Sequence, residues 1–236
     1  GWLFGFGYFA SNLYWISISL TFDESFNFLI PLTIILIPGF LSIFYALVAY
    51  LFIILKPRKN LSAFFLFCLI FGIMEFIRGS ILTGFPWNLI AYSFLSQLEI
   101  TSITSIIGTY GFNLFCISLF SCPALLILKE SNKDIGIFFL FVLCLVISYL
   151  YGNHYKKKFY TTNEIIYDYK LRAINSNISL DRFYSSNNPV LAIKELIEIS
   201  NPNFDEKTIF IWPEGILPNI SQKELIEYKW LFNNKF

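Results

Sequence analysis

Long apolar runs separated by short polar segments are the dominant pattern along this chain. A helix needs about 20 apolar residues to cross the hydrocarbon core of a bilayer, where no water can satisfy the backbone. Five runs predict such spans: residues 1–22, 25–55, 60–77, 100–128 and 135–152. Residues 79–98 are uncharged but contain Gly79, Gly84 and Pro86, which predicts a re-entrant or interfacial loop. Residues 1–153 are therefore predicted to form a polytopic α-helical membrane domain.

Residues 154–236 follow a different pattern. Two short apolar runs, 171–174 and 208–212, are bounded by polar or proline-containing turns and predict buried strands. Between them, residues 189–200 carry apolar side chains at helical spacing. A strand–helix–strand order favours an α/β domain. The segment is shorter than a complete domain of that class, so we expect only its beginning here.

Composition supports a membrane protein. Apolar residues make up 56% of the chain and charged residues 14%, against about 45–50% and 25% in soluble proteins. Only 12 of the 33 charged residues precede His154, although that part is the larger share of the chain. The net charge of +1, without a basic stretch interleaved with aromatic residues, gives no reason to expect a nucleic-acid partner.

Basic residues in short loops predict the orientation in the membrane. One loop holds Lys56, Arg58 and Lys59, and a second loop on the same side of the predicted bundle holds Lys129 and Lys133. Such loops face the cytoplasm, and five spans then place the C-terminal domain outside. The three lysines that follow His154 would then lie on the outer side, against the tendency of basic residues to stay in the cytoplasm. They introduce a long domain, however, where such charges carry less weight.

The cysteine and histidine content predicts no nucleophile and no metal site. All four cysteines lie inside apolar runs, match no metal-ligand spacing and are expected to be small core residues. His154 is the only histidine, lies at a span end and is expected to be interfacial. No Ser/His or Cys/His arrangement remains, and we expect no cofactor.

Glu75 and Arg78 are the candidate polar pair within the membrane domain. Their spacing of three places them on one helix face at the end of the third predicted span. Ionisable groups at membrane depth face protein or water because lipid exposure is costly. The pair is either a structural ion pair that lets the helix end enter the headgroup region, or a functional pair beside the loop at 83–88.

Glu214 is the candidate catalytic residue of the C-terminal segment. The sequence Phe-Ile-Trp-Pro-Glu-Gly at 210–215 places this carboxylate just after the second predicted strand. Open α/β sheets carry ligands and reactive groups at the carboxyl ends of their strands, where a carboxylate can act as a general base. The alternative is an ordinary acidic residue in a solvated turn.

Four segments combine these features in a specific order. They are Gly-Trp-Leu-Phe-Gly-Phe-Gly-Tyr-Phe at 1–9 with Tyr-Trp-Ile at 14–16, Glu-Phe-Ile-Arg-Gly at 75–79, Leu-Thr-Gly-Phe-Pro-Trp-Asn at 82–88 with Ala-Tyr-Ser at 91–93, and Ile-Trp-Pro-Glu at 211–214. In this order they resemble the bacterial apolipoprotein N-acyltransferases, polytopic inner-membrane enzymes with a periplasmic nitrilase-like (CN hydrolase) domain. The resemblance covers essentially the whole chain, and the second and third segments are its most specific part.

The resemblance implies both fold and chemistry. The fold would be a polytopic helical membrane domain over residues 1–153 and, over 154–236, the N-terminal part of a nitrilase-like α-β-β-α sandwich. Family members pass an acyl chain from a phospholipid to a cysteine thioester, and then to the N-terminal diacylglyceryl-cysteine of a lipoprotein. Their sites use a glutamate base, a lysine for the oxyanion and a cysteine nucleophile, and Glu214 matches the glutamate.

The chain also departs from the family pattern. No cysteine follows Glu214, and the lysines at 223, 229 and 235 are too close to it to match the family's lysine. Hydrophobic segments of the family that precede the equivalent of residue 1, and a final span, have no counterpart. We therefore expect a partial chain, inactive by itself. Glu75, Arg78 and Trp87 are the expected substrate-binding or loop-positioning residues of its membrane domain.

The expected partners and the competing functions follow from this resemblance. Partners would be a phospholipid acyl donor, a diacylated lipoprotein acceptor and membrane lipid, with the chain monomeric in the bacterial inner (cytoplasmic) membrane and its C-terminal domain periplasmic. No cofactor, metal or nucleic acid is expected. A non-catalytic membrane scaffold is the main alternative. A transporter is a weaker one, because transporters usually carry internal repeats and we find none in the sequence.

Overall fold

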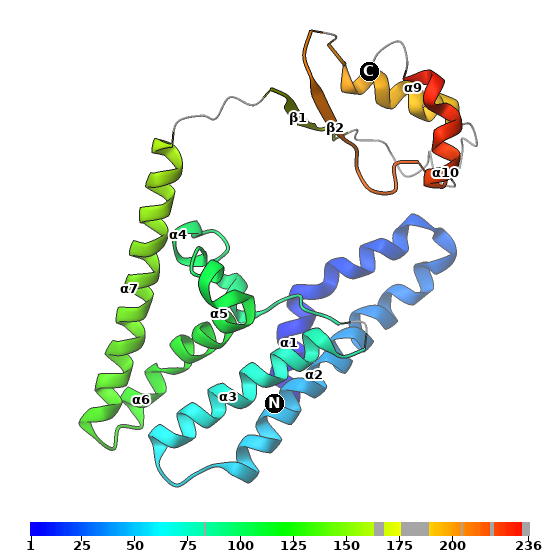
Figure 1. The fold of residues 1–236 in the computed structure, drawn as a ribbon. Helices are drawn as coiled ribbons and strands as arrows, with labels where there is room; N and C mark the ends of the chain where they lie inside the picture. Colours follow the sequence, from blue (N-terminus) through cyan, green and yellow to red (C-terminus); the bar gives the residue numbers. More distant parts are fainter. Residues whose placement is uncertain (83, 163–167, 176–188, 204, 218–219, 233–236) are drawn as a thin grey trace. The chain divides into compact units, whose positions relative to one another are not determined.

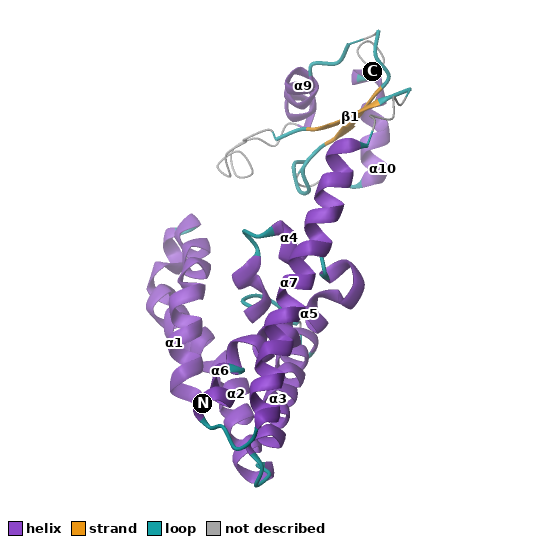
Figure 2. Ribbon diagram, turned by 90° about the vertical axis from the view of Figure 1, so that its left-hand side faces the viewer, coloured by secondary structure: helices purple, strands orange, loops and turns teal. Residues whose placement is uncertain are grey.

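A computed structural model describes the chain except for residues 83, 163–167, 176–188, 204, 218–219 and 233–236. It divides into two compact units (Figure 1), which we call the helical unit (Gly1–Thr162) and the C-terminal unit (Asn163–Phe236). The helical unit contains only helices and connecting loops among its described residues, and the strands lie in the C-terminal unit (Figure 2).

The helical unit is built from α-helices joined by shorter helical segments. In chain order they are α1 (Trp2–Leu13), η1 (Tyr14–Phe22), η2 (Glu24–Leu29), α2 (Ile30–Leu55), α3 (Asn60–Ser80), η3 (Ile90–Phe94), α4 (Leu98–Thr101), α5 (Thr104–Ser121), α6 (Pro123–Ile127) and α7 (Asn132–Thr161), where η denotes a 3₁₀ helix. The segment between α3 and α5 contains only short elements, so it is not a span, as predicted.

Four helical segments of the described residues are long and apolar enough to cross a membrane. They are Glu24–Leu55, Asn60–Ser80, Thr104–Ile127 and Asn132–Thr161. These correspond to the second to fifth predicted spans. The segment Thr104–Ile127, which corresponds to the fourth predicted span, begins later than predicted. It is interrupted at Gly108, whose φ of 71° is incompatible with a continuous α-helix.

The first predicted span, residues 1–22, differs from the prediction. It is not one continuous α-helix, because α1 ends at Leu13 and the 3₁₀ helix η1 follows. In η1 the hydroxyls of Ser17, Ser19 and Thr21 each donate to the carbonyl three residues earlier. Hydroxyl side chains of this kind compete for backbone carbonyls and favour tighter or bent helical geometry. The apolar pattern alone did not reveal this change.

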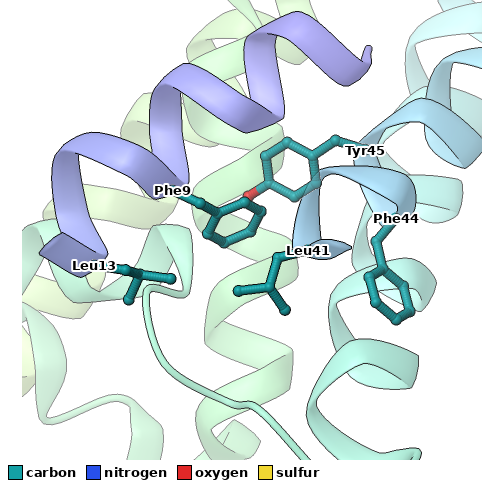
Figure 3. Packing of buried hydrophobic residues seen from close by; sticks show 5 residues of the cluster. All are labelled: Phe9, Leu13, Leu41, Phe44 and Tyr45. Atoms are coloured by element: carbon teal, nitrogen blue, oxygen red, sulfur yellow. The ribbon is translucent and has the colours of Figure 1, made fainter. Parts of the chain in front are cut away.

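Helix α1 packs along α2 through an aromatic core. Phe9 and Leu13 of α1 meet residues of α2 in one buried cluster (Figure 3), completed by Leu41, Phe44 and Tyr45. The Phe9 and Tyr45 ring centroids are 5.1 Å apart, with the rings tilted against each other. Aromatic pairs in such tilted geometry add stability beyond the area that they bury. This core fixes α1 beside the end of α3 that carries the candidate polar pair.

A second buried cluster joins α3, α5 and α6. Its buried members are Phe64, Cys68, Ile117, Cys122 and Leu125. Three of the four cysteines are buried, and Cys144 is half-buried. They pack as small apolar residues, as the sequence predicted.

The two loops with basic residues lie on the same side of the helical unit. Asn60, at the start of α3, donates from its side-chain Nδ2 to the Leu128 carbonyl at 2.8 Å and from its backbone N–H to a carboxylate oxygen of Glu130 at 3.2 Å. These contacts tie the loop between α2 and α3 to the loop between α6 and α7. The prediction that Lys56 and Lys129 share one side is confirmed.

The C-terminal unit contains a small parallel sheet. Its elements are β1 (Lys170–Ala173), α9 (Pro189–Ser200), β2 (Thr208–Ile211), α10 (Gln222–Leu225) and η4 (Ile226–Leu231). The two strands pair in parallel, with Lys170 opposite Thr208 and Ala173 opposite Ile211. Helix α9 lies between the strands in sequence, as a parallel pair requires, and buries three apolar side chains, those of Ile193, Leu196 and Ile197. The predicted strand–helix–strand order is confirmed, whereas the nitrilase-like sandwich stays a prediction.

Candidate functional site

Glu75 and Arg78 form a buried ion pair at the end of α3. Arg78 Nη2 lies 2.7 Å from Glu75 Oε2, and neither side chain is exposed to solvent. A buried pair of this kind is costly to desolvate, and further hydrogen bonds to the charged groups offset part of that cost. The partners of Arg78 therefore determine what the pair does.

Arg78 holds the loop that follows its own helix. Its Nη1 donates to the carbonyls of Phe85 and Trp87, both at 2.8 Å. The guanidinium also lies over the ring of Phe9, 5.2 Å from its centroid, at a distance suited to a cation–π contact. The guanidinium group of Arg78 thus contacts the carboxylate of Glu75, two carbonyls of the loop and the ring of Phe9. We call this set of contacts the arginine clamp.

The backbone of the loop needs this support because its course is irregular. Gly84 has a φ of 73°, in the left-handed region that favours glycine, and a Cβ there would lie 2.7 Å from the Gly79 carbonyl oxygen. Leu82 and Asn88 also have positive φ, which is uncommon for residues with a side chain. The Tyr8 hydroxyl of α1 donates to the Asn88 carbonyl at 2.9 Å and so secures the far end of the loop.

Trp87 presents its ring to the surface while its carbonyl is held inside. The side chain is exposed and meets Trp15 of η1 edge to face, with ring centroids 6.5 Å apart. Of the three residues predicted for this site, the structure therefore joins Glu75 and Arg78 directly, and it joins Trp87 to them through its backbone. This geometry is compatible with both alternatives for the pair, the structural and the functional one, so its functional role stays a prediction.

An apolar cavity of about 400 Å³ lies next to the arginine clamp. Its wall is formed by α2 residues such as Ile37, Phe40 and Leu41 together with Phe85 of the loop, and Arg78 is the one charged residue among the described residues that line it. A cavity with this lining accepts an aliphatic chain better than a polar group.

Several residues of this site were not predicted from the sequence. Tyr8 and Phe9 come from α1, and Tyr45 of α2 packs against the ring of Phe9. Asn113 of α5 is buried and accepts a 3.0 Å hydrogen bond from the Ala91 N–H at its Oδ1, which fixes η3. A polar residue inside an apolar run was the available signal for Asn113.

Glu214 lies in the C-terminal unit, three residues after the end of β2. Its side chain is exposed on a turn, so solvent reaches the carboxylate. The strand before it is held firmly, because Trp212 Nε1 donates to Ser200 Oγ at 2.9 Å. Arg172 of β1 donates from Nη1 to the carbonyls of Ser200 and Asn201 at 3.0 and 3.2 Å. Glu214 thus follows a fixed strand end, at the carboxyl edge of the parallel pair.

The residues that the structure describes include no candidate metal site. No group of three or more histidine, cysteine, aspartate or glutamate side chains is placed there to hold a metal ion.

Comparison with known sequences identifies the family. Residues 1–122, which include the arginine clamp and its loop, match the family model described as the apolipoprotein N-acyltransferase N-terminal domain. The chain belongs to the apolipoprotein N-acyltransferase family. The resemblance carried by the Glu-Phe-x-Arg-Gly and Thr-Gly-Phe-Pro-Trp segments is confirmed.

Individual apolipoprotein N-acyltransferases align along most of the chain. The protein of that name from Rhodopseudomonas palustris is 28% identical over 234 residues, which are 95% of this chain and 43% of the relative. That from Wigglesworthia glossinidia brevipalpis is 30% identical over 226 residues, 92% of this chain and 42% of the relative. A third, from Brucella melitensis, is 38% identical over 127 residues. This chain thus spans less than half the length of the first two relatives.

Proposed function

We propose that this chain forms the membrane part and the first catalytic element of an enzyme that transfers an acyl chain from a phospholipid to the N-terminal diacylglyceryl-cysteine of a lipoprotein. Family membership supports the reaction class. The observation that carries the assignment of the base is the place of Glu214, just beyond β2 of a parallel strand pair. That edge is where α/β sheets hold reactive groups.

The proposed reaction has two steps, with Glu214 moving the proton in each. In the first, Glu214 accepts a thiol proton while the sulfur attacks the ester carbonyl of the phospholipid. A C–S bond forms, the ester C–O bond breaks, and the proton passes to the departing lysophospholipid oxygen. In the second, the lipoprotein amine attacks the thioester, the C–N bond forms, the C–S bond breaks, and Glu214 carries the amine proton to the thiolate. This is the general logic of covalent acyl transfer with a general base.

The cysteine and the oxyanion-binding lysine would lie in parts of the enzyme outside these 236 residues. No cysteine follows Glu214, and the four that precede it lie in α3, α5, the junction of α5 with α6, and α7. Cysteines of that kind behave as packing residues. In this proposal the chain supplies the base and the lipid-facing machinery.

In the helical unit, the arginine clamp would hold the loop after α3 in the shape that contacts the lipid. Arg78 fixes the carbonyls of Phe85 and Trp87 and so sets where the exposed Trp87 ring meets the membrane surface. The 400 Å³ apolar cavity beside the clamp would hold an acyl chain of a substrate. Glu75 would act through Arg78 as a positioning residue and would make no contact with the reacting atoms.

We further propose that the protein lies in the bacterial inner membrane with its C-terminal unit in the periplasm. Support comes from Lys56, Arg58 and Lys59 between α2 and α3, on the same side as Lys129, because basic short loops stay in the cytoplasm. With that side cytoplasmic, α7 ends outside whether or not α1 crosses the membrane. A periplasm-dependent reporter fused after Gly152 should be active, and a reporter active only in the cytoplasm would refute this orientation.

The catalytic assignment is tested in the full-length enzyme with a labelled phospholipid donor. Thioester is trapped by acid quench and identified by its sensitivity to hydroxylamine. Glu214→Gln keeps the size of the side chain and removes the base, so thioester formation should slow by about 10²–10⁴-fold. Glu227→Gln, which neutralises another exposed glutamate of the same unit, is the control and should keep the parental rate. A Glu214→Gln enzyme as fast as this control would remove Glu214 from the mechanism.

A further inference from the structure

A larger cavity, of about 780 Å³, lies in the helical unit and shares no lining residue with the cavity beside the arginine clamp. Its wall is formed by η3, α4, α5 and the last turns of α7. Most of the wall is apolar or aromatic, with Leu98, Phe112 and Phe159 among its members. Lys156 is the one charged residue among the described residues that line it.

Helix α4 and the start of α5 lie beside α7 (Figure 1), and three contacts hold these elements together next to the cavity. Gly152 allows α7 to approach α4 closely, because a Cβ at this position would overlap the carbonyl oxygen of Glu99. The Glu99 carboxylate accepts a hydrogen bond from Lys156 Nζ at 2.6 Å. Ser105 Oγ and Tyr151 Oη lie 3.2 Å apart and share a hydrogen bond. The short helix α4 is thereby held against α7, and the cavity remains beside it.

The C-terminal end of α7 has the composition of a membrane–water interface. Helix α7 has 30 residues and is about 45 Å long at 1.5 Å per residue, whereas the hydrocarbon core is about 30 Å thick. Its ends therefore extend into the headgroup regions. The last turns carry three lysines in a row, residues 156–158, next to Tyr155 and Tyr160. Tyrosine is enriched at this depth, and lysine side chains near a span end extend into the headgroup region, so the cavity would open at the level of the lipid headgroups.

We propose that this cavity binds one anionic phospholipid of the bilayer, with the lipid phosphate at Lys156 and the upper acyl chains against the apolar wall. Charge complementarity supports an anionic occupant, because Lys156 lines the cavity and Lys157 and Lys158 raise the local positive potential. An ammonium group has three donors, and Glu99 takes one of them, which leaves donors for a phosphate. Basic pockets between membrane helices bind anionic headgroups for the same reason. This inference does not depend on the proposed acyl transfer.

The Glu99–Lys156 pair makes the proposal testable, because substitutions of its two members should change the affinity for the lipid in opposite directions. Glu99 competes with a phosphate for Lys156, so Glu99→Gln should strengthen lipid binding. Lys156→Gln removes the cation and should weaken it. A pair that served only to hold α4 against α7 would be broken equally by both changes, and binding would then change in the same direction.

Native mass spectrometry of the intact, delipidated protein in detergent measures this binding. The probes are dioleoylphosphatidylglycerol, dioleoylphosphatidylcholine and inorganic phosphate. The parental protein should prefer phosphatidylglycerol. Lys156→Gln should lower its affinity on the order of tenfold, as expected for loss of a charge-assisted hydrogen bond, and Glu99→Gln should raise it a few-fold. Lys156→Arg should keep the binding, and Lys133→Gln, which lies outside the cavity, should leave it unchanged.

Four results would overturn the proposal. They are equal binding of the two lipids, changes of the same sign in Lys156→Gln and Glu99→Gln, an unchanged affinity in Lys156→Gln, and displacement of the lipid by inorganic phosphate at equal concentration. The last would mean that the apolar wall contributes nothing. A cavity-filling variant, Thr109→Trp, keeps Lys156 and should nevertheless reduce lipid binding. Full binding in that variant would be a fifth contradicting result, because it would place the lipid elsewhere.

Discussion

Two arginines, one in each unit, share two kinds of contact in different surroundings. Arg78 donates from Nη1 to two loop carbonyls and lies over the ring of Phe9. Arg172 donates from Nη1 to two carbonyls at the end of α9 and lies over the ring of Phe210, 5.7 Å from its centroid. Arg78 is 2% exposed, whereas Arg172 is half-buried.

The difference between them is the carboxylate. Arg78 is paired directly with the buried Glu75, while Arg172 remains partly solvated. A cation removed from water needs a counter-charge, and one that keeps part of its hydration does not. A guanidinium that binds two carbonyls thus requires a second buried charge in the helical unit, where it is itself buried. In the C-terminal unit, where it stays partly solvated, it requires none.

The largest loss of stability is expected for a substitution that leaves the buried Glu75 carboxylate without its cation. Arg78→Gln leaves Glu75 buried without its partner, which typically destabilises a protein by about 3–5 kcal/mol. Thermal or denaturant unfolding in detergent measures the loss. The double variant Glu75→Gln/Arg78→Gln should recover part of it, because no charge then remains buried. If the double variant is as unstable as the sum of the two single variants, the pair is not the coupled unit described above.

A smaller effect is expected for the half-buried arginine. Arg172→Gln removes two hydrogen bonds to carbonyls and a cation–π contact but leaves no buried charge, so we expect a loss of about 1–3 kcal/mol. Hydrogen exchange of the amides in β1 and α9 reports it. A loss as large as that of Arg78→Gln would contradict the comparison, because burial of the counter-charge would then not be the deciding factor.

The hydrogen bond that fixes the strand before Glu214 is expected to contribute less. Ser200→Ala leaves Trp212 Nε1 without its acceptor, which should cost about 0.5–1.5 kcal/mol. Proteolytic susceptibility of the C-terminal unit measures this. Trp212→Phe should have little further effect in the Ser200→Ala background, since both substitutions remove the same bond. Additive losses would mean that the two side chains act independently.

The smallest effect is expected at the exposed ion pair of the C-terminal unit. Lys170 Nζ lies 2.7 Å from Glu206 Oε1 and, by its hydrogen bond, lowers the pKa of the Glu206 carboxyl. A carboxyl group with a lowered folded-state pKa contributes stability above its unfolded-state pKa, and this is lost as the pH falls through the folded-state value. Acid titration followed by hydrogen exchange should show a slightly smaller acid-induced loss in Lys170→Gln. An identical titration would show that the pair adds nothing measurable.

Much of the fold could be predicted because periodicity and length determine it directly. Helix α9 was predicted with its observed bounds, and the strands were predicted within one residue, at 171–174 and 208–212 against 170–173 and 208–211. The structure of residues 1–22 was not predicted correctly, because apolar content does not distinguish an α-helix from a 3₁₀ helix such as η1. The serine and threonine hydroxyls that bind carbonyls there belong to a pattern that hydropathy ignores.

The candidate site could be predicted only in its local part. The spacing of Glu75 and Arg78 indicated a shared helix face, and the structure pairs them. The carbonyl partners of Arg78 and its contact with Phe9 depend on the course of the loop and on the packing of α1 against α2, which a linear pattern does not contain. The same holds for Asn113, whose partner Ala91 lies 22 residues away.

In the proposed enzyme the buried clamp supports structure while Glu214 performs chemistry, and one paired measurement tests this division of roles directly. Unfolding temperature and single-turnover thioester formation are measured on the same preparations of full-length Glu214→Gln, Glu75→Gln/Arg78→Gln and parental enzyme. Glu214→Gln should retain the parental unfolding temperature and lose about 10²–10⁴-fold in rate. The clamp variant should unfold at lower temperature and lose less rate. A Glu214→Gln enzyme that forms the thioester at the parental rate, or that loses rate only because it unfolds, would contradict the account.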